Sequence, residues 1–439
     1  MSTTKKALVR PQSIGGFPEY TPQQQLVARA MLARIVTTFE LYGFTPIETP
    51  AVERLEVLLA KGGDTDKEMY LLQRLDPRAE GEKEADLGLH YDLTVPFARY
   101  VAQHFDSLSF PFKRYQIQHC WRGERPQEGR FRQFLQCDLD VVSVDKLALS
   151  FDSEIPLVAC EILDSMGLGA YQFRVSNRKI LEGFLAGLGT GDIPVTFITR
   201  WLDKLEKIGP AKVSAGLSEL GLSAEAVERC LQIASIHTAD LSFAEKVQAL
   251  GVTHPRLELG LEELTQVIAR LLQERAGSVL ADLSVTRGLD YYTGSVYEVR
   301  WLEHPTLGSI GAGGRYDDLA SHYTNQKLPG VGLSLGFSRI FSKLVSSGKL
   351  PLGASTPTQV LVTWLEDSPD KARSMARALR ARGIPTEVFH DKTHVTKQLN
   401  YANKKGIPYV LFEADCQIKN MVSGEQGEVD LSSWVPARA

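Results

Sequence analysis

The stretch from residue 112 to residue 142, FKRYQIQHCWRGERPQEGRFRQFLQCDLDVV, holds the residues best suited to chemistry. In an extended strand, successive side chains point to opposite faces. One face of its second half is apolar, with Leu135, Cys137, Leu139 and Val141. The other face carries Arg132, Phe134, Gln136, Asp138 and Asp140. Burying such a polar face without partners costs free energy, so it predicts a bound polar ligand, and a solvated hairpin face is the alternative.

The loop between the two strand-like halves is rich in charges of both signs. It contains Arg122, Glu124, Arg125, Glu128 and Arg130. The planar guanidinium group of arginine matches the oxygen atoms of phosphate groups. The hairpin therefore predicts a site for a ligand that has both phosphate and polar groups.

Two further stretches carry polar groups at places where the backbone changes direction. LGLHYDLTVPFARY places Asp92 and Thr94 at a strand-to-helix junction, where capping of the helix is the simpler explanation. RGLDYYTGSVYEV places Arg287, Tyr291 and Tyr292 between glycines, and core aromatic packing is the alternative there.

Two glycine-rich stretches follow. We expect IGAGGRYDDLA, residues 310–320, to be a turn. PGVGLSLGFSRI predicts an apolar strand that enters a helix near Phe337, with Arg339 in the first turns. Its glycines do not have the spacing of a dinucleotide-binding loop.

The surrounding elements predict several structural regions. Helical spacing from Pro22 to Tyr42 predicts an amphipathic helix that ends at Gly43. Residues 177–277 have the leucine- and alanine-rich spacing of a helical insertion, and residues 349–358 have the composition of a linker. Beyond the linker, alternating strands and helices predict a small α/β domain with parallel pairing.

Bulk composition restricts the class of protein. The 439 residues carry a formal net charge of −4 and 43% hydrophobic residues, which is typical of a globular protein without a global polycationic surface. The five cysteines have no C-x-x-C spacing, which argues against a zinc ribbon or a disulfide framework. Without an apolar run of membrane-spanning length or a signal-peptide core, the sequence predicts a cytoplasmic protein.

Together these stretches resemble the class II aminoacyl-tRNA synthetases, and closely the histidyl-tRNA synthetase family. GFTPIETPAVE is similar to motif 1, the hairpin at 112–142 to motif 2, and PGVGLSLGFSRI to motif 3. RGLDYYTGSVYEV and GAGGRYDDL are similar to the two histidine-specific signatures. The resemblance implies an α+β fold, in which an antiparallel sheet is flanked by helices. It implies a catalytic core at 1–176 and 278–348, the insertion at 177–277, the linker at 349–358 and an anticodon-binding-type domain at 359–439.

The resemblance also implies roles for single residues. Arg287 and Arg122 would be catalytic, at the α-phosphate of ATP and the amino-acid carboxylate. The remaining ATP-binding residues would be Glu124, Arg130, Phe134 and Arg339. Histidine would be bound by Asp92, Thr94, Arg122, Gln136, Asp140, Arg287, Tyr291 and Tyr292. Asp138 receives no role.

The implied activity is that of a histidine–tRNA ligase. Its substrates would be L-histidine, ATP accompanied by Mg²⁺, and tRNA(His), and the chain would be a homodimer. The alternative is a regulatory paralogue, a subunit of the ATP phosphoribosyltransferase of histidine synthesis, which would bind histidine without charging tRNA. Aspartate stands at 92 and 140 where some family members have glutamate, and the basic hairpin of the C-terminal domain is shortened.

Overall fold

The computed structural model describes residues 9–59, 68–74, 86–190, 193–286, 292–317 and 320–437. The chain forms two compact units. One comprises the residues up to Pro18 together with Arg34–Lys343, and the other comprises Glu19–Ala33 together with Leu344–Ala439. Helix α1, Pro22–Leu41, has residues in both units, and the chain leaves it through Gly43, whose φ is +76°.

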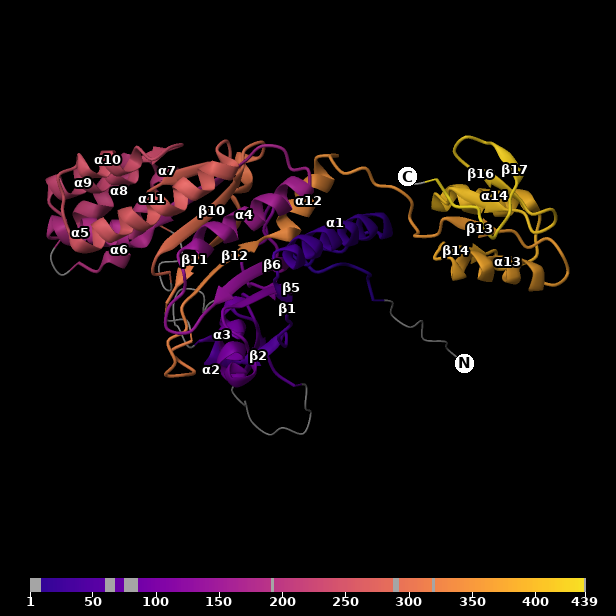
Figure 1. Cartoon of the computed structure of the whole chain (residues 1–439), viewed down its shortest axis with the longest axis horizontal. Coiled ribbons are helices and arrows are strands. Elements are labelled where there is room, and N and C mark those ends of the chain that lie inside the picture. The colour runs from indigo at the N-terminus through magenta and orange to yellow at the C-terminus, as the bar shows by residue number, and fades with distance from the viewer. Residues whose placement is uncertain are drawn as a thin grey trace, which may run out of the picture. The chain divides into compact units, whose positions relative to one another are not determined.

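A nine-stranded sheet forms the centre of the larger unit (Figure 1), in the order β1-β5-β6-β12-β11-β10-β7-β9-β8. Among its described pairings, only β1/β5 at one edge and β7/β9 near the other edge are parallel. The strands are β1 Thr45–Pro46, β5 Phe112–Trp121, β6 Gln133–Val142, β7 Tyr171–Asn177, β8 His237–Thr238, β9 Val279–Asp282, β10 Ser295–Trp301, β11 Ser309–Tyr316 and β12 Gly330–Leu335. This sheet and the helices around it confirm the predicted α+β class.

Strands β5 and β6 form the predicted hairpin, and both of its faces carry buried side chains. Cys137, Leu139 and Val141 are fully buried on the apolar face of β6. Helix α4, Ser150–Ser165, contacts β6 and β12. On the polar face, Asp138 and Asp140 are also buried, at 3% exposure each. The alternative of a solvated hairpin face is therefore wrong for these two carboxylates.

A group of helices lies beside the β7 and β9 end of the sheet (Figure 1), where α11 contacts both strands. The helices are α5 Arg178–Leu188, α6 Val195–Leu202, α7 Leu205–Ile208, α8 Pro210–Glu219, α9 Ala224–Ala234, α10 Phe243–Gln248 and α11 Pro255–Arg275. They occupy the segment in which helical spacing predicted an insertion, and its exact boundaries stay a prediction.

A smaller layer precedes the hairpin in the chain. Its three strands have the order β2-β4-β3, and all of their pairings are antiparallel. The elements are β2 Val52–Arg54, α2 Leu55–Leu58, β3 Leu71–Leu72, β4 Leu87–Leu89, α3 Thr94–Gln103 and the short 3-10 helix η2 Phe105–Ser107. A second 3-10 helix, η3 Pro305–Leu307, connects β10 to β11.

The expectation of a turn is wrong for residues 310–316, because Ser309–Tyr316 is strand β11 in the middle of the sheet. Glycine is required here by close packing and not by a turn. A Cβ atom on Gly313 would collide with the backbone carbonyl of Gly332 on the neighbouring strand β12. The glycines of β11 therefore let two central strands approach each other closely.

The smaller unit contains a five-stranded sheet with the order β14-β13-β15-β16-β17. Strand β13 is parallel to both β14 and β15, which confirms the predicted α/β domain with parallel pairing. Its elements are β13 Val360–Val362, α13 Asp370–Ala381, β14 Thr386–Val388, α14 Val395–Lys405, β15 Tyr409–Leu411, β16 Gln417–Asn420 and β17 Gln426–Glu428. Helix α12, Phe337–Ser346, ends just before residues 347–359, which contain no helix or strand.

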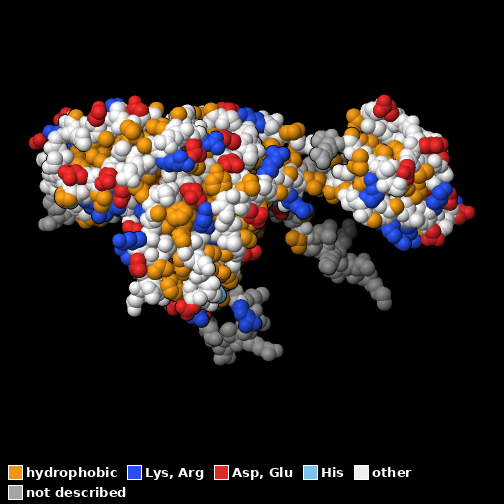
Figure 2. Space-filling view, in the orientation of Figure 1, with side chains coloured by type: hydrophobic (Ala, Val, Ile, Leu, Met, Phe, Trp, Pro, Cys, Tyr) orange, Lys and Arg blue, Asp and Glu red, His pale blue; other side chains and the backbone are white. Residues whose placement is uncertain are grey.

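The visible surface of the described residues carries lysine, arginine, aspartate and glutamate side chains interspersed on both units (Figure 2). This distribution agrees with the small net charge of −4. Within the described part of the chain, no helix has the length and apolar character needed to cross a membrane.

Candidate active site

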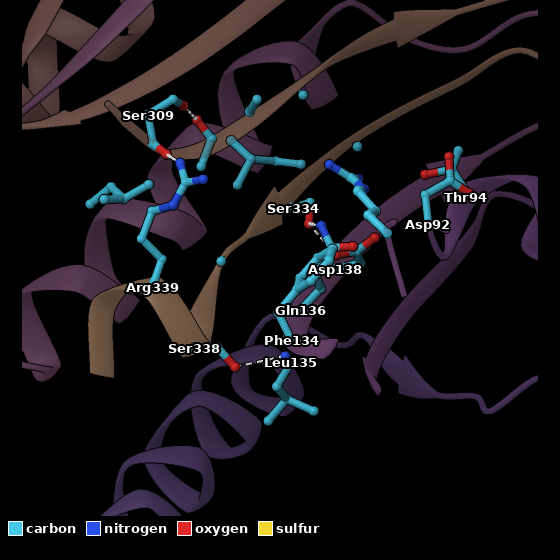
Figure 3. Close-up of a pocket in the computed structure, with 18 of the residues that line it drawn as sticks. Asp92, Thr94, Phe134, Leu135, Gln136, Asp138, Ser309, Ser334, Ser338 and Arg339 are labelled. Carbon is cyan, nitrogen blue, oxygen red and sulfur yellow. Dashed lines mark hydrogen bonds between the residues drawn. The ribbon is translucent and has the colours of Figure 1, made fainter. Parts of the chain in front are cut away.

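A cavity of about 330 Å³ lies on the polar face of the hairpin. Strands β6, β11 and β12 contribute to its wall, together with the hairpin loop and the first residues of α3 and α12 (Figure 3). Ten of the predicted site residues line it: Asp92, Thr94, Arg122, Glu124, Arg130, Phe134, Gln136, Asp140, Tyr292 and Arg339. The other two, Arg287 and Tyr291, lie outside the described residues.

Asp92 and Thr94 stand where the chain enters α3. The carboxylate oxygen Oδ1 of Asp92 accepts a hydrogen bond from the backbone N–H of Val95 at 3.0 Å. Thr94 is the first residue of the helix, so the expectation that Thr94 caps it is wrong, whereas the bond from Val95 to Asp92 confirms the capping expected of Asp92. Burial raises the pKa of Asp92, and the hydrogen bond from Val95 and the charge of Arg122 act in the opposite direction.

Asp140 is held by two buried partners. Arg114 on β5 forms an ion pair with it at 2.6 Å, and the hydroxyl of Tyr316 on β11 donates to it at 2.9 Å. Burial raises the pKa of Asp140 to about 6, although Arg114 and Tyr316 oppose the shift. A carboxylate has about four acceptor sites, so Asp140 can still accept a hydrogen bond from a ligand. Gly332 makes room for it, because a Cβ there would collide with the Asp140 carboxylate.

Arg114 was missed by the sequence analysis. Its side chain is completely buried, and its guanidinium carbon lies 4.3 Å from the centroid of the Phe97 ring. The signal lies in the first half of the hairpin, where Arg114, Gln116 and Gln118 alternate with other residues. In the register of the sheet these three stand opposite Asp140, Asp138 and Gln136. The polar face therefore continues across both strands.

Asp138, which received no role from the sequence, also lines the cavity. The hydroxyl of Ser334 on β12 donates a short hydrogen bond to it and accepts one from the side-chain amide of Gln136. Burial raises the pKa of Asp138 to about 7, with Arg114 and Ser334 opposing the shift and Asp140 and Asp92 adding to it. Three carboxylates, Asp92, Asp138 and Asp140, are thus gathered in one part of the cavity.

Cationic and aromatic side chains line the part of the cavity that is formed by the hairpin loop and the start of β6. The Nε of Arg122 donates to the carbonyl of Tyr91 at 3.0 Å, and its guanidinium carbon lies 5.1 Å from the centroid of the Phe134 ring. Glu124 and Arg130 form an ion pair at 3.2 Å in the loop of the hairpin. An aromatic ring beside arginines can stack a nucleobase while the guanidinium groups bind its phosphates.

Arg339, in the first turn of α12, forms hydrogen bonds to both the hairpin loop and β11. Its Nε donates to the carbonyl of Gly129 at 2.7 Å, and its Nη1 donates to the carbonyl of Ser309 at the start of β11. The hydroxyl of the preceding residue, Ser338, accepts from the backbone N–H of Leu135 at 2.8 Å. The start of α12 therefore connects the hairpin loop, β6 and β11.

Comparisons with known proteins extend over nearly the whole chain. The family model for histidyl-tRNA synthetase matches residues 16–340, and a model for the anticodon binding domain matches residues 359–436. The histidine–tRNA ligase of Thermobifida fusca is 49% identical over 98% of this chain and 99% of its own length. The chain belongs to the histidyl-tRNA synthetase family. The family resemblance found in the sequence is thereby confirmed.

The histidine–tRNA ligase of Micrococcus luteus is 46% identical to this chain, over 97% of this chain and 96% of its own length. The crystal structure of histidyl-tRNA synthetase from Nostoc sp. PCC 7120 has a TM-score of 0.84 at 36% identity. It covers 96% of this chain and 97% of its own.

Proposed function

We propose that this chain is a histidine–tRNA ligase. It activates L-histidine with ATP to histidyl-adenylate and pyrophosphate, and then transfers histidine to the 3′ end of tRNA(His). The observation that carries the proposal is the single cavity in which ten residues from four separate stretches of sequence meet. Its family membership and its near full-length relatives support the same activity.

In the first step, a carboxylate oxygen of histidine attacks the α-phosphorus of ATP and the bond to the β-phosphate bridging oxygen breaks. The protein has to align the two reactants and stabilise negative charge. Arg122 is suited to both tasks, since its bond to Tyr91 fixes the guanidinium beside Phe134. We assign Arg287 to the same α-phosphate on the basis of the family resemblance.

The carboxylate-rich part of the cavity is suited to the positive and polar groups of histidine. Asp92, Thr94 and Gln136 would bind the α-ammonium group, while Asp140 with Tyr292 and Tyr291 would bind the imidazole. An imidazole both donates and accepts hydrogen bonds, so a carboxylate and a phenol together can recognise its two nitrogens. The bonds from Arg114 and Tyr316 keep the Asp140 carboxylate in one orientation for this task.

ATP would occupy the cationic part. Phe134 would stack on the adenine ring, Glu124 would accept from the adenine amino group, and Arg130 and Arg339 would bind the β- and γ-phosphates. We expect Mg²⁺ to enter as part of the ATP substrate, since it is commonly bound through substrate phosphates and water and not by an all-protein cage.

In the second step, the terminal hydroxyl of tRNA attacks the carbonyl carbon of the adenylate and AMP leaves. The anticodon-binding-type domain at 359–436 supports tRNA as the second substrate and favours the ligase over the regulatory paralogue. We further propose that the chain works as a homodimer in the cytoplasm.

Pyrophosphate exchange tests the activation step. Labelled pyrophosphate should enter ATP when histidine is present and not when any of the other nineteen amino acids replaces it. A chain that binds histidine but catalyses no exchange would have the behaviour of the regulatory paralogue and would overturn the proposal.

A further inference from the structure

Among the described residues, the side-chain amide of Gln136 forms a hydrogen bond through its nitrogen but not through its oxygen. Its Nε2 donates to the hydroxyl oxygen of Ser334 at 2.5 Å. Its carbonyl oxygen Oε1 is buried and receives no hydrogen bond from the residues that the structure describes. A buried acceptor without a donor costs about 1–3 kcal/mol, so a donor from a ligand would be favourable there.

The orientation of this amide depends on one proton. The hydroxyl of Ser334 has a single hydrogen, and Asp138 accepts it (Figure 3). With that hydrogen committed, the Ser334 oxygen can serve Gln136 only as an acceptor. Gln136 must then present its NH₂ group to Ser334, which directs its carbonyl oxygen away from Ser334.

We propose that Asp138 is a positioning residue, which acts through Ser334 to fix Gln136 as a hydrogen-bond acceptor for the ammonium group of the amino-acid substrate. This inference rests on the proposed function and deepens it, since Asp138 itself does not need to touch the substrate. The three side chains come from two neighbouring strands, with Ser334 directly opposite Asp138 in the register of β12 and β6.

The arrangement requires an ionised Asp138, so it is favoured at pH values above the pKa of this carboxyl group. Arg114 faces it from β5, Asp140 lies on its own strand, Asp92 lies before α3, and the buried thiols of Cys120 and Cys137 are near it. Burial raises the pKa of Asp138 to about 7. A protonated Asp138 could donate to Ser334, and the hydroxyl could then donate to Gln136, which would turn the amide and present NH₂ to the ammonium group.

Two histidine analogues isolate the ammonium contact. Histidinol keeps the ammonium group and lacks the carboxylate, whereas imidazole-4-propionate keeps the carboxylate and lacks the ammonium group. In Asp138→Ala, we expect the KM for histidine and the inhibition constant of histidinol to rise together by about tenfold or more, the effect of losing a hydrogen bond to a charged group. The inhibition constant of imidazole-4-propionate and the KM for ATP should stay within about twofold of the wild-type values.

The inference would be overturned if the binding of histidine, histidinol and imidazole-4-propionate became equally weaker, or if the binding of none of them changed. Ser334→Ala should reproduce the selective pattern, and it remains informative if Asp138→Ala does not fold. Ser338→Ala is the matched control, because its hydroxyl bonds to the backbone of Leu135 and not to Gln136, so the ratio of the two inhibition constants should not change. Absence of histidine-dependent exchange in the wild-type protein would instead refute the proposed function.

Discussion

Replacing Arg114 with methionine tests how the carboxylate-rich part of the cavity is stabilised. The guanidinium is completely buried, stacks on Phe97 and pairs with Asp140 at 2.6 Å. Methionine has a similar length and keeps the apolar contacts, but it leaves Asp140 buried without its cation. Breaking a buried ion pair in this way costs about 3–5 kcal/mol of folding free energy.

The folding free energy lost in Arg114→Met should depend on pH, and the direction of this dependence follows from the pKa of Asp140. The pKa of Asp140 is about 6 in the folded protein and about 3.9 in an unfolded chain. The folded wild-type protein therefore already becomes less stable as pH rises from about 3.9 to about 6, because the buried carboxyl group loses its proton. Without Arg114, the pKa in the folded protein rises further and the decrease continues above pH 6. The difference between variant and wild type should therefore be greatest near pH 8 and should shrink toward pH 5.

Denaturant unfolding followed by tryptophan fluorescence measures this difference, because three of the five tryptophans, Trp121, Trp201 and Trp301, belong to the larger unit. Arg130→Met is the matched control, since the side chain of Arg130 is half-exposed in its pair with Glu124 and such pairs contribute at most about 1 kcal/mol. A loss below about 1 kcal/mol for Arg114→Met at pH 8, or one that is equally large at pH 5, would refute the reasoning.

Three further predictions concern activity. Phe134→Ala should raise the KM for ATP by about tenfold in the exchange assay, because base–aromatic stacking contributes about 1–3 kcal/mol, and an unchanged KM would exclude stacking on Phe134. Arg287→Ala should lower the exchange rate by about 10²–10³-fold, as the loss of one charge-stabilising donor does elsewhere, and a near wild-type rate would remove Arg287 from the α-phosphate. Deletion of residues 356–439 should spare exchange and impair tRNA charging, and unchanged charging would mean that this domain does not contact tRNA.

The alternation of polar and apolar residues in β6 was enough to predict the hairpin, its packed apolar face and the polar face that lines the cavity. The pattern is readable because the hairpin is local and each strand is long enough, at ten residues, to repeat its period several times. The α/β pattern of the smaller unit was predictable for a different reason, because its strand-like and helix-like segments alternate along the chain.

Two features of the structure could not be predicted from the sequence pattern. The glycines of β11 have the composition of a turn, and only the contact of Gly313 with strand β12 shows that they serve close packing. The pairing of Arg114 with Asp140 depends on the register of two strands and on burial, and neither follows from composition. Asp138 acquires a role only through Ser334, which is 196 residues away in the sequence.

Charging of tRNA(His) with labelled histidine tests the central claim most directly. The purified chain, given ATP, Mg²⁺, histidine and a tRNA(His) transcript, should attach histidine to the 3′ end of the tRNA, and omission of ATP should abolish the product. Histidine binding without formation of histidyl-tRNA, or charging with another amino acid at a comparable rate, would contradict the assignment.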